Sequence, residues 1–256
     1  MKIFTFFILL FTCNIINAQD SPIDTDRPDQ TESVNLVPKK WLQFEAGFSS
    51  QENKKNNHEC LTPTLLSKYG LSNRIELRLI TSIITNSQIY IPTGTVSKTG
   101  LEPVEIGAKI SLWEEKKWIP KTSFLFHFAI PGLASKANNI DLIAPNFRFT
   151  LQNSIAKNFA IGYNIGAEWD GEDRRPAYIY TFSPGLNFAD KWYGYIEAFG
   201  SIKKNEPSQH SIDGGVAYNV TNNFKLDISS GAGITKAAPN WYIAIGVSKR
   251  FNLNKK

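Results

Sequence analysis

The chain has 256 residues and a formal net charge of +5, and its 28 basic and 23 acidic residues are spread along its whole length. A nucleic-acid-binding protein would need Lys and Arg gathered on one surface, so this distribution argues against that class. Beyond the first residues, no stretch approaches the roughly 20 apolar residues of a membrane-spanning helix, so the sequence does not predict a helical membrane protein.

The first 18 residues have the pattern of a secretory signal peptide. Lys2 precedes an apolar run from Ile3 to Ile16, and the small residue Ala18 follows the run. We therefore predict Sec-type export with signal cleavage near Ala18. Lipidation of Cys13 is an alternative, but the bulky residue Phe11 shortly before it fits a lipidation site poorly.

Cysteine and histidine are too scarce to hold the fold together or to bind a metal. Once the signal peptide is removed, Cys60 is the only cysteine left, so no intramolecular disulfide can form. This cysteine and the scattered His58, His127 and His210 make no recurring metal-binding pattern. We predict neither a metal site nor a cofactor.

Residues 19–40 form an N-terminal segment that we place in the periplasm or in the lumen of a barrel. Its string DRPDQTES, residues 26–33, contains Pro28, three acids and one arginine without apolar periodicity, so it is not a membrane strand. We predict that it folds into the periplasmic mouth and pairs with lumen arginines as a partial plug. An ordered cap or a flexible leader without a gating role is the alternative. The candidate plug residues are Asp26, Arg27, Asp29 and Glu32.

Residues 41–251 fall into segments of about ten residues in which polar and apolar side chains alternate. In the segment 74–84, Arg74, Glu76 and Arg78 point to one side and the intervening Ile and Leu residues to the other. The same division occurs in residues 145–153, 159–169, 224–234 and 241–251. A face of rings and aliphatics opposite a face of glycine and charge is typical of a wall between lipid and a narrow wet lumen.

The connections between these segments alternate between short turns and longer polar loops. The short turns are predicted at Leu71–Asn73, Glu114–Lys117, Ala156–Asn158, Ala189–Lys191 and Thr221–Asn223, and the long loops at Gln51–Glu59, Thr85–Thr99, Pro131–Ile143, Asp170–Pro176, Ile202–Gln209 and Thr235–Asn240. This rhythm predicts an all-β fold, a closed antiparallel transmembrane β-barrel of about 12 strands, with short turns and both termini in the periplasm. Closure is required because an open sheet edge in hydrocarbon leaves backbone groups unpaired. A polar tail, residues 252–256, follows the barrel.

Aromatic residues gather at the ends of the predicted strands. Trp41, Trp118 and Trp192 stand beside short turns, and Trp169 and Trp241 stand beside long loops. Such rings are typical of the girdles that lie at the two surfaces of a membrane. Aromatic residues in the core of an ordinary soluble β protein are the alternative.

The string DRPDQTES, then Leu36–Pro38 and a strand that begins WLQFE, resembles the start of a known bacterial family. The likeness continues through Tyr69–Leu71 with Arg74, Glu76 and Leu77, through Gly107–Lys109 and Trp118–Pro120, and through Asp213, Gly215, Tyr218 and Asp227. The sequence is similar to outer-membrane proteins described as transporters and named for a MetA pathway of phenol degradation. The resemblance implies an outer-membrane β-barrel of a Gram-negative bacterium that works in transport.

The lumen face of the predicted barrel carries charges of both signs. The candidates for the lumen wall and its constriction are Lys68, Arg74, Glu76, Arg78, Lys109, Arg148, Glu168, Asp213, Asp227 and Arg250, and Glu45, Glu105, Glu197 and Lys225 share their face. A narrow interior cannot hydrate all these groups, so they form either an ion-pair lattice, a lined solute path, or both. We place the constriction first at Arg74, Glu76 and Arg78, and expect neutralising the two arginines together to change the conductance or ion preference.

The function that follows is a channel or transporter for passive passage of small solutes, including hydrophobic or aromatic ones. Its predicted partners are outer-membrane lipid, the solute, periplasmic chaperones and the barrel assembly machinery, with no nucleic acid. A non-conducting scaffold or binding barrel is the first alternative. A barrel hydrolase, which needs a Ser and a His on the lipid-facing wall, is the second. We predict no catalytic residues, because none of the three histidines is followed two positions later by serine.

Overall fold

The computed structural model describes residues 21–53, 57–90 and 94–254. The predicted signal peptide and its cleavage site near Ala18 lie outside these residues, as does the end of the polar tail. The described residues contain no helix that is long and apolar enough to cross a membrane. They form strands joined by turns and loops, and a strand-free stretch, residues 21–40, precedes the first strand.

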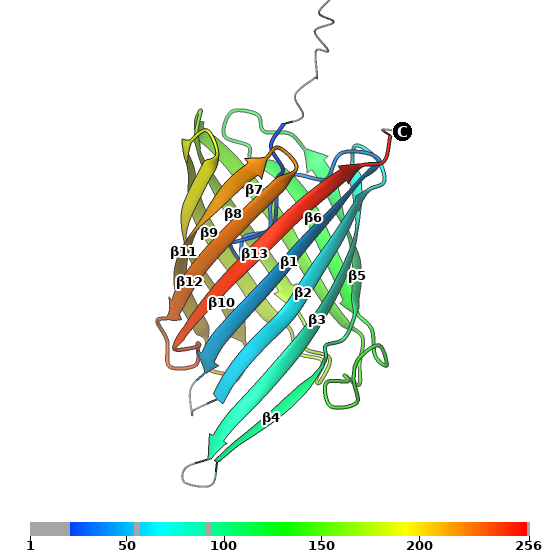
Figure 1. Cartoon of the computed structure of the whole chain (residues 1–256), viewed down its shortest axis with the longest axis vertical. Coiled ribbons are helices and arrows are strands. Elements are labelled where there is room, and N and C mark those ends of the chain that lie inside the picture. Colours follow the sequence, from blue (N-terminus) through cyan, green and yellow to red (C-terminus); the bar gives the residue numbers. More distant parts are fainter. Residues whose placement is uncertain (1–20, 54–56, 91–93, 255–256) are drawn as a thin grey trace, which may run out of the picture.

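Thirteen strands make up the described fold. They are β1 (Trp41–Asn53), β2 (Asn57–Gly70), β3 (Ile75–Tyr90), β4 (Gly94–Leu101), β5 (Glu105–Trp113), β6 (Lys121–Ala129), β7 (Ala144–Ala156), β8 (Phe159–Glu168), β9 (Ala177–Ala189), β10 (Trp192–Lys203), β11 (Gln209–Thr221), β12 (Phe224–Gly233) and β13 (Trp241–Asn252). Each pairs antiparallel with its neighbours, and the strands tilt around a common axis (Figure 1).

The sheet closes on itself because the first and last strands pair along their whole length, from Trp41 with Asn252 to Glu52 with Trp241. Two strands share one side of β3. Its first part, Ile75–Ile80, pairs with β5, and its outer part, Ile83–Tyr90, pairs with β4. Strands β4 and β5 therefore occupy one position around the barrel. The result is a closed antiparallel barrel with twelve strand positions, which confirms the predicted fold class.

Short turns lie at one end of the barrel and longer connections at the other (Figure 1). The short-turn end holds residues 71–74, 114–120, 157–158, 190–191 and 222–223, and the long-loop end holds residues 130–143, 169–176, 204–208 and 234–240. The long loops predicted at residues 85–99 and 51–59 are wrong, because strand structure runs through most of both regions.

The polar β3–β4 hairpin extends beyond the end of the neighbouring strands (Figure 1). Cross-strand pairs of hydroxyls support it, with 2.8 Å between Thr85 and Thr99 and 2.8 Å between Ser87 and Ser97. Its side chains alternate little in polarity, and those of Thr95 to Thr99 on β4 are all exposed. For this reason, a prediction based on alternating polarity assigns residues 85–99 to a loop.

The barrel wall has a polar inner face and an apolar outer face. Buried side chains on the strands include Gln43, Glu45, Glu76 and Lys109. The outer face presents large apolar side chains such as Ile196, which is 68% exposed, and many further Ile, Leu, Phe and Trp residues. Period-two alternation within each strand produces this division, because successive side chains point to opposite faces of a sheet. The buried core of the molecule is therefore the lumen.

Candidate functional site

Residues 21–40, hereafter the N-terminal segment, lie inside the barrel in its short-turn half (Figure 1). The segment is held at the rim by Ile23, whose backbone N–H donates to the carbonyl of Asn222 at 2.8 Å. Arg250 contacts the carbonyl of Ser21 at the same rim. The apolar side chains of Ile23, Val34 and Val37 are almost fully buried. The lumen therefore contains a piece of this chain rather than water alone.

Three cationic side chains of the wall meet the carboxylate of Asp26. Lys68 Nζ lies 2.8 Å and Arg78 Nη1 2.9 Å from Asp26 Oδ2, and Lys109 Nζ lies 2.9 Å from Oδ1. The backbone N–H of Ser33 donates to Oδ1 as well, at 2.9 Å. Burial raises the pKa of the Asp26 carboxyl, but the three cations outweigh burial and hold this pKa well below its usual value.

The register of the strands brings these cations together. Lys68 on β2 stands directly opposite Arg78 on β3, and Lys109 on β5 stands opposite Glu76 on β3. Side chains opposite one another on the same face of a sheet have their Cβ atoms about 5 Å apart. Three neighbouring strands thus supply one cluster, which we call the cationic triad: Lys68, Arg78 and Lys109.

Two carboxylates of the wall partly neutralise the cationic triad. Glu45 contacts the ammonium of Lys68, and Glu76 Oε1 lies 3.1 Å from Arg78 Nη1. Glu76 also accepts a hydrogen bond from the backbone N–H of Val37 at 2.7 Å. The wall thereby binds the backbone of the N-terminal segment as well as its side chains.

Glu32, Ser33 and Val34 of the N-terminal segment are also bound to the wall. Glu32 Oε2 lies 2.9 Å from Arg78 Nη2, and the backbone N–H of Glu32 donates to Asn164 Oδ1 at 2.7 Å. Lys109 donates to the carbonyl of Ser33 at 2.7 Å, and the Ser123 hydroxyl donates to the carbonyl of Val34 at 2.7 Å. Strands β3, β5, β6 and β8 therefore all hold this short stretch.

Arg27 binds where the barrel closes. Its guanidinium lies 3.0 Å from the carboxylate of Asp227 on β12. It rests against Gly47 on β1 and Gly246 on β13, which stand opposite each other in the sheet. A Cβ atom at either glycine would overlap the guanidinium. The two glycines therefore leave the space that Arg27 occupies.

The opposite side of the N-terminal segment faces carboxyl groups. Glu197 accepts from the backbone N–H of Gln30 at 2.7 Å and from the Thr31 hydroxyl. The Ser183 hydroxyl donates to Asp29 at 3.2 Å. Burial, and then the nearby Glu197 carboxylate, raise the pKa of Asp29 well above its usual value. Asp26 and Asp29 thus occupy opposite electrostatic environments although they are three residues apart.

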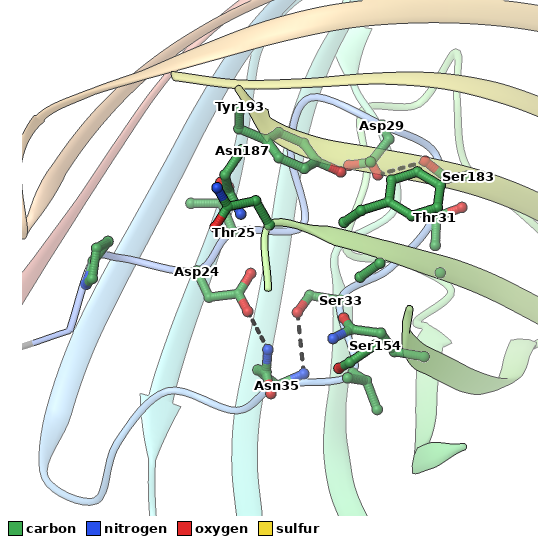
Figure 2. A pocket seen from close by; sticks show the side chains of 18 of the residues that line it. Asp24, Thr25, Asp29, Thr31, Ser33, Asn35, Ser154, Ser183, Asn187 and Tyr193 are labelled. Atoms are coloured by element: carbon green, nitrogen blue, oxygen red, sulfur yellow. Dashed lines mark hydrogen bonds between the residues drawn. The ribbon is translucent and has the colours of Figure 1, made fainter. Parts of the chain in front are cut away.

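A cavity of about 1020 Å³ lies between the N-terminal segment and the barrel wall (Figure 2). Asp24, Thr25 and Asn35 line it from the segment, and Asn187 and Tyr193 line it from β9 and β10. A second cavity, of about 450 Å³, lies at the long-loop end and is lined by residues including Ser82, Glu105 and Trp169. The N-terminal segment lines the first cavity and not the second.

The predicted lumen residues separate into groups in the structure. Lys68, Glu76, Arg78 and Lys109 gather around Asp26 and Glu32, while Asp227 binds Arg27. Asp213 instead contacts the hydroxyl of Tyr242. Arg148 lies 3.5 Å from Glu168. Arg250 donates to Asn223 Oδ1 at 2.8 Å and lies over the ring of Trp41.

Arg74 differs from the expectation. It lies in the turn before β3, where the alternation of strand side chains no longer applies, and its side chain is exposed. The cluster expected at Arg74, Glu76 and Arg78 is therefore built from Glu76 and Arg78 with Lys68 and Lys109 from the neighbouring strands.

Several residues at the site have neutral side chains, and nothing in the sequence indicates that they bind the N-terminal segment. Asn164 and Ser123 bind the backbone of the N-terminal segment, and Thr181 bonds to the hydroxyl of Thr31 at 2.6 Å. Gly47 and Gly246 act only by leaving space for Arg27. The alternation predicts that these side chains face the lumen, but it does not predict which residue of the N-terminal segment each one contacts.

The profile of a family described as "Putative MetA-pathway of phenol degradation" matches residues 25–251. The chain belongs to this family. The match begins within the N-terminal segment and ends in β13, so it covers most of this segment as well as the barrel strands. No curated protein matches the sequence.

Solved structures similar to this member of the family include an outer-membrane channel and two porins. The COG4313 outer membrane channel from Pseudomonas putida F1 has a TM-score of 0.68 at 9% identity, over 86% of this chain and 98% of that one. The KdgM porin has a TM-score of 0.54 at 14% identity, over 82% and 99% of the two chains. The NanC porin has a TM-score of 0.52 at 11% identity, over 81% and 98%. The shared feature is the barrel fold.

Proposed function

We propose that this protein is a channel of the bacterial outer membrane through which small solutes pass passively, with the N-terminal segment as a partial plug. One observation carries the proposal: an irregular stretch of chain lies inside a closed barrel, with cavities of about 1020 Å³ and 450 Å³ in the lumen. The apolar outer face suits lipid, and the polar inner face suits hydrated solutes.

We place the short turns and the N-terminal segment on the periplasmic side. Outer-membrane barrels have short periplasmic turns and longer extracellular loops. An exported chain that loses its signal peptide near Ala18 would begin at the periplasmic mouth, which is where the segment enters the lumen (Figure 1). Periplasmic chaperones and the barrel assembly machinery would then be its partners during insertion.

The plug role is supported by how the N-terminal segment is bound. Residues 21–37 join no strand ladder and are held by side-chain hydrogen bonds and ion pairs from at least six strands. Such contacts can be broken and remade without opening the barrel, because the strand pairs remain intact. The segment can therefore change position while the wall stays closed.

The lumen wall restricts the class of solute. The family resemblance implies small hydrophobic or aromatic molecules, while the wall beside the segment carries buried charges, hydroxyls and amides. We therefore propose that a solute passes only if it presents a polar or charged group to this wall, whatever the nature of the rest of the molecule.

The test is planar-bilayer conductance of the refolded mature protein with and without residues 19–40. Discrete current steps that become larger in the shortened protein are the expected result, because removing the N-terminal segment widens the path. Heat-modifiable migration on gels checks that both forms are folded barrels. The absence of steps from both folded forms would contradict the channel.

A non-conducting scaffold or binding barrel is the second candidate, and the occupied lumen is the observation that favours it. The same recordings separate the two functions.

A hydrolase has less support. His127 is buried in the lumen and accepts a hydrogen bond from Arg78 at 2.9 Å, and His210 Nδ1 is 2.9 Å from the Tyr180 hydroxyl. Neither of these two described side chains pairs with a serine.

A further inference from the structure

Asp26 presents to the lumen wall the group that a small carboxylate solute would present. Both of its oxygens are bound, Oδ2 by Lys68 and Arg78 and Oδ1 by Lys109 and the backbone N–H of Ser33, at 2.8 to 2.9 Å. Charge-assisted hydrogen bonds of this length are among the strong ones in proteins. The wall therefore supplies three of the four donors that bind this carboxylate, and the N-terminal segment itself supplies the fourth.

This carboxylate site belongs mainly to the rigid part of the molecule. Three of its four donors are on strands, and Lys68, Arg78 and Lys109 are 3%, 2% and 0% exposed. Their positions are fixed by direct cross-strand register between β2 and β3 and between β3 and β5. The occupant, in contrast, is on an irregular segment. The cationic triad would therefore persist if Asp26 moved away.

The charge of the wall defines the ligand that this site would take. Glu45 remains beside Lys68, and Glu76 remains beside Arg78, whatever the N-terminal segment does. Lys109 forms its ion pairs, among the described residues, with Asp26 and with Glu32 at 3.8 Å. The three cations and two carboxylates of the wall leave one net positive charge, which suits a monoanion.

A chain of contacts joins the cavity at the long-loop end to the cationic triad. The cavity of about 450 Å³ reaches Glu105. Glu105 lies 3.9 Å from His127, and His127 is bonded to Arg78 of the cationic triad. The larger cavity adjoins the other side of the segment and is lined by Ser33 and Val34. The triad thus connects Glu105, which lines the smaller cavity, with Ser33, which lines the larger one and accepts a hydrogen bond from Lys109.

We propose that Lys68, Arg78 and Lys109 form a binding site for the carboxylate of a small monoanionic solute, and that Asp26 occupies this site until such a solute displaces it. The inference rests on the proposed channel function and names its solute class. The carboxylate would contact Lys109 first among the three cations, because Lys109 loses its ion-pair partners when the segment leaves.

The direct test uses Asp26→Ala, which removes the tethered carboxylate and frees the three cations of the wall to bind a carboxylate from solution. Acetate should raise the unfolding temperature of this variant above that in equal chloride, because a ligand that binds the folded state stabilises it. Acetamide, which has the same shape without charge, should have no effect. Adding Lys109→Gln should weaken acetate binding by more than about tenfold, because the charged partner of the ligand is lost.

Lys225→Gln in the same background is the matched control. Lys225 is another buried lumen lysine bound to the N-terminal segment, 3.2 Å from Thr25 Oγ1, but it lies outside the cationic triad. Acetate binding should survive this change. Equal effects of acetate, acetamide and chloride, or equal losses in the two lysine variants, would overturn the site. If Asp26→Ala does not fold, Asp26→Asn with the same additives gives the comparison.

Conductance separates this inference from the function on which it rests. In channels of the Asp26→Ala variant, acetate at constant ionic strength should reduce the chloride current, with half the effect at the concentration that half-saturates the thermal shift. Acetate stabilisation without conductance in any form would keep the binding site and remove the channel. Conductance without an acetate effect on either current or unfolding would keep the channel and remove the binding site.

Discussion

Asp26 and Asp29 show how one stretch of chain can place two identical side chains in opposite environments. The first carboxyl meets three cations of the wall, and the second is buried beside Glu197 with a hydroxyl from Ser183. A buried carboxylate is stable when cations compensate its desolvation, and it is protonated more easily when another carboxylate faces it. The position of each aspartate along the N-terminal segment therefore decides whether its carboxyl is more easily or less easily protonated.

The raised pKa of Asp29 gives a prediction about pH. A carboxyl with a higher pKa in the folded state than in the unfolded state favours folding fully below its usual pKa of 3.8, and loses that contribution as pH rises through the raised value. Asn resembles the protonated form. Asp29→Asn should therefore match the wild type in strong acid and be more stable at neutral pH, as measured by unfolding temperature.

Asp26→Asn is the natural comparison, because the pKa shift at this position has the opposite sign. A lowered pKa in the folded state gives stability above the usual value, and this stability is lost as pH falls through the lowered pKa. The Asn variant should be less stable than the wild type at neutral pH and approach it in strong acid. Parallel pH profiles for the two variants would contradict both assignments.

Among the elements, β1 and β13 meet at a seam where Gly47 and Gly246 leave space for Arg27 of the N-terminal segment. Gly246→Ala would place a Cβ against the guanidinium of Arg27 and force it from its site beside Asp227. Overpacking of this kind costs about 1 to 3 kcal/mol. We expect more frequent or larger current steps in planar bilayers, because the segment loses an anchor while the wall keeps its charges.

Gly194→Ala is the control for that experiment. Gly194 lies on β10, and its added Cβ would come 3.1 Å from the ring of Phe188 rather than near the N-terminal segment. The current should match that of the wild type. If both alanine variants opened the channel equally, a general effect of glycine replacement on the barrel would explain the result better than release of Arg27.

The β3–β4 hairpin offers a prediction at the other end of the barrel. Its β3 strand pairs with β2 as far as Gln88, and beyond that point Ile89 and Tyr90 pair only with Thr95 and Gly94 of β4. Replacing residues 89–95 with an Asn-Gly turn should leave the unfolding temperature within about 2 °C of the wild type, since every pair between β3 and β2 is kept. Loss of heat-modifiable migration on gels would show that the hairpin is needed for the barrel to form.

The elements also show what the sequence could predict. Strands with one lipid-like and one polar face were predictable, because alternation is imposed residue by residue at positions such as Ile75 to Arg78. Alternation does not identify the outer hairpin, because polarity hardly changes from one residue to the next between Thr85 and Gln88 and between Thr95 and Thr99. Arg74 was placed on the lumen face because the start of β3 cannot be located from alternation alone.

The binding of the N-terminal segment depends on the whole molecule, and the sequence predicts its place in the periplasmic mouth but not most of its partners. Its partners come from β2, β3, β5, β8, β10 and β12, which are brought together by closure of the barrel. No local pattern relates Asp26 to Lys109, which lies 83 residues away. Pairing with lumen arginines was predicted, whereas the role of the lysines required the three-dimensional register.

The burial of the ion pairs between the N-terminal segment and the wall predicts how the conductance of the complete channel responds to salt. Raising the ionic strength from 0.1 M to 1 M shortens the Debye length from about 10 Å to about 3 Å, which weakens exposed ion pairs far more than buried ones. The side chains of Lys68, Arg78, Lys109 and Asp26 are at most 5% exposed. The ratio of wild-type conductance to that of the protein without residues 19–40 should therefore stay constant across this range. A ratio that rises toward one at high salt would mean that screened surface charges hold the segment.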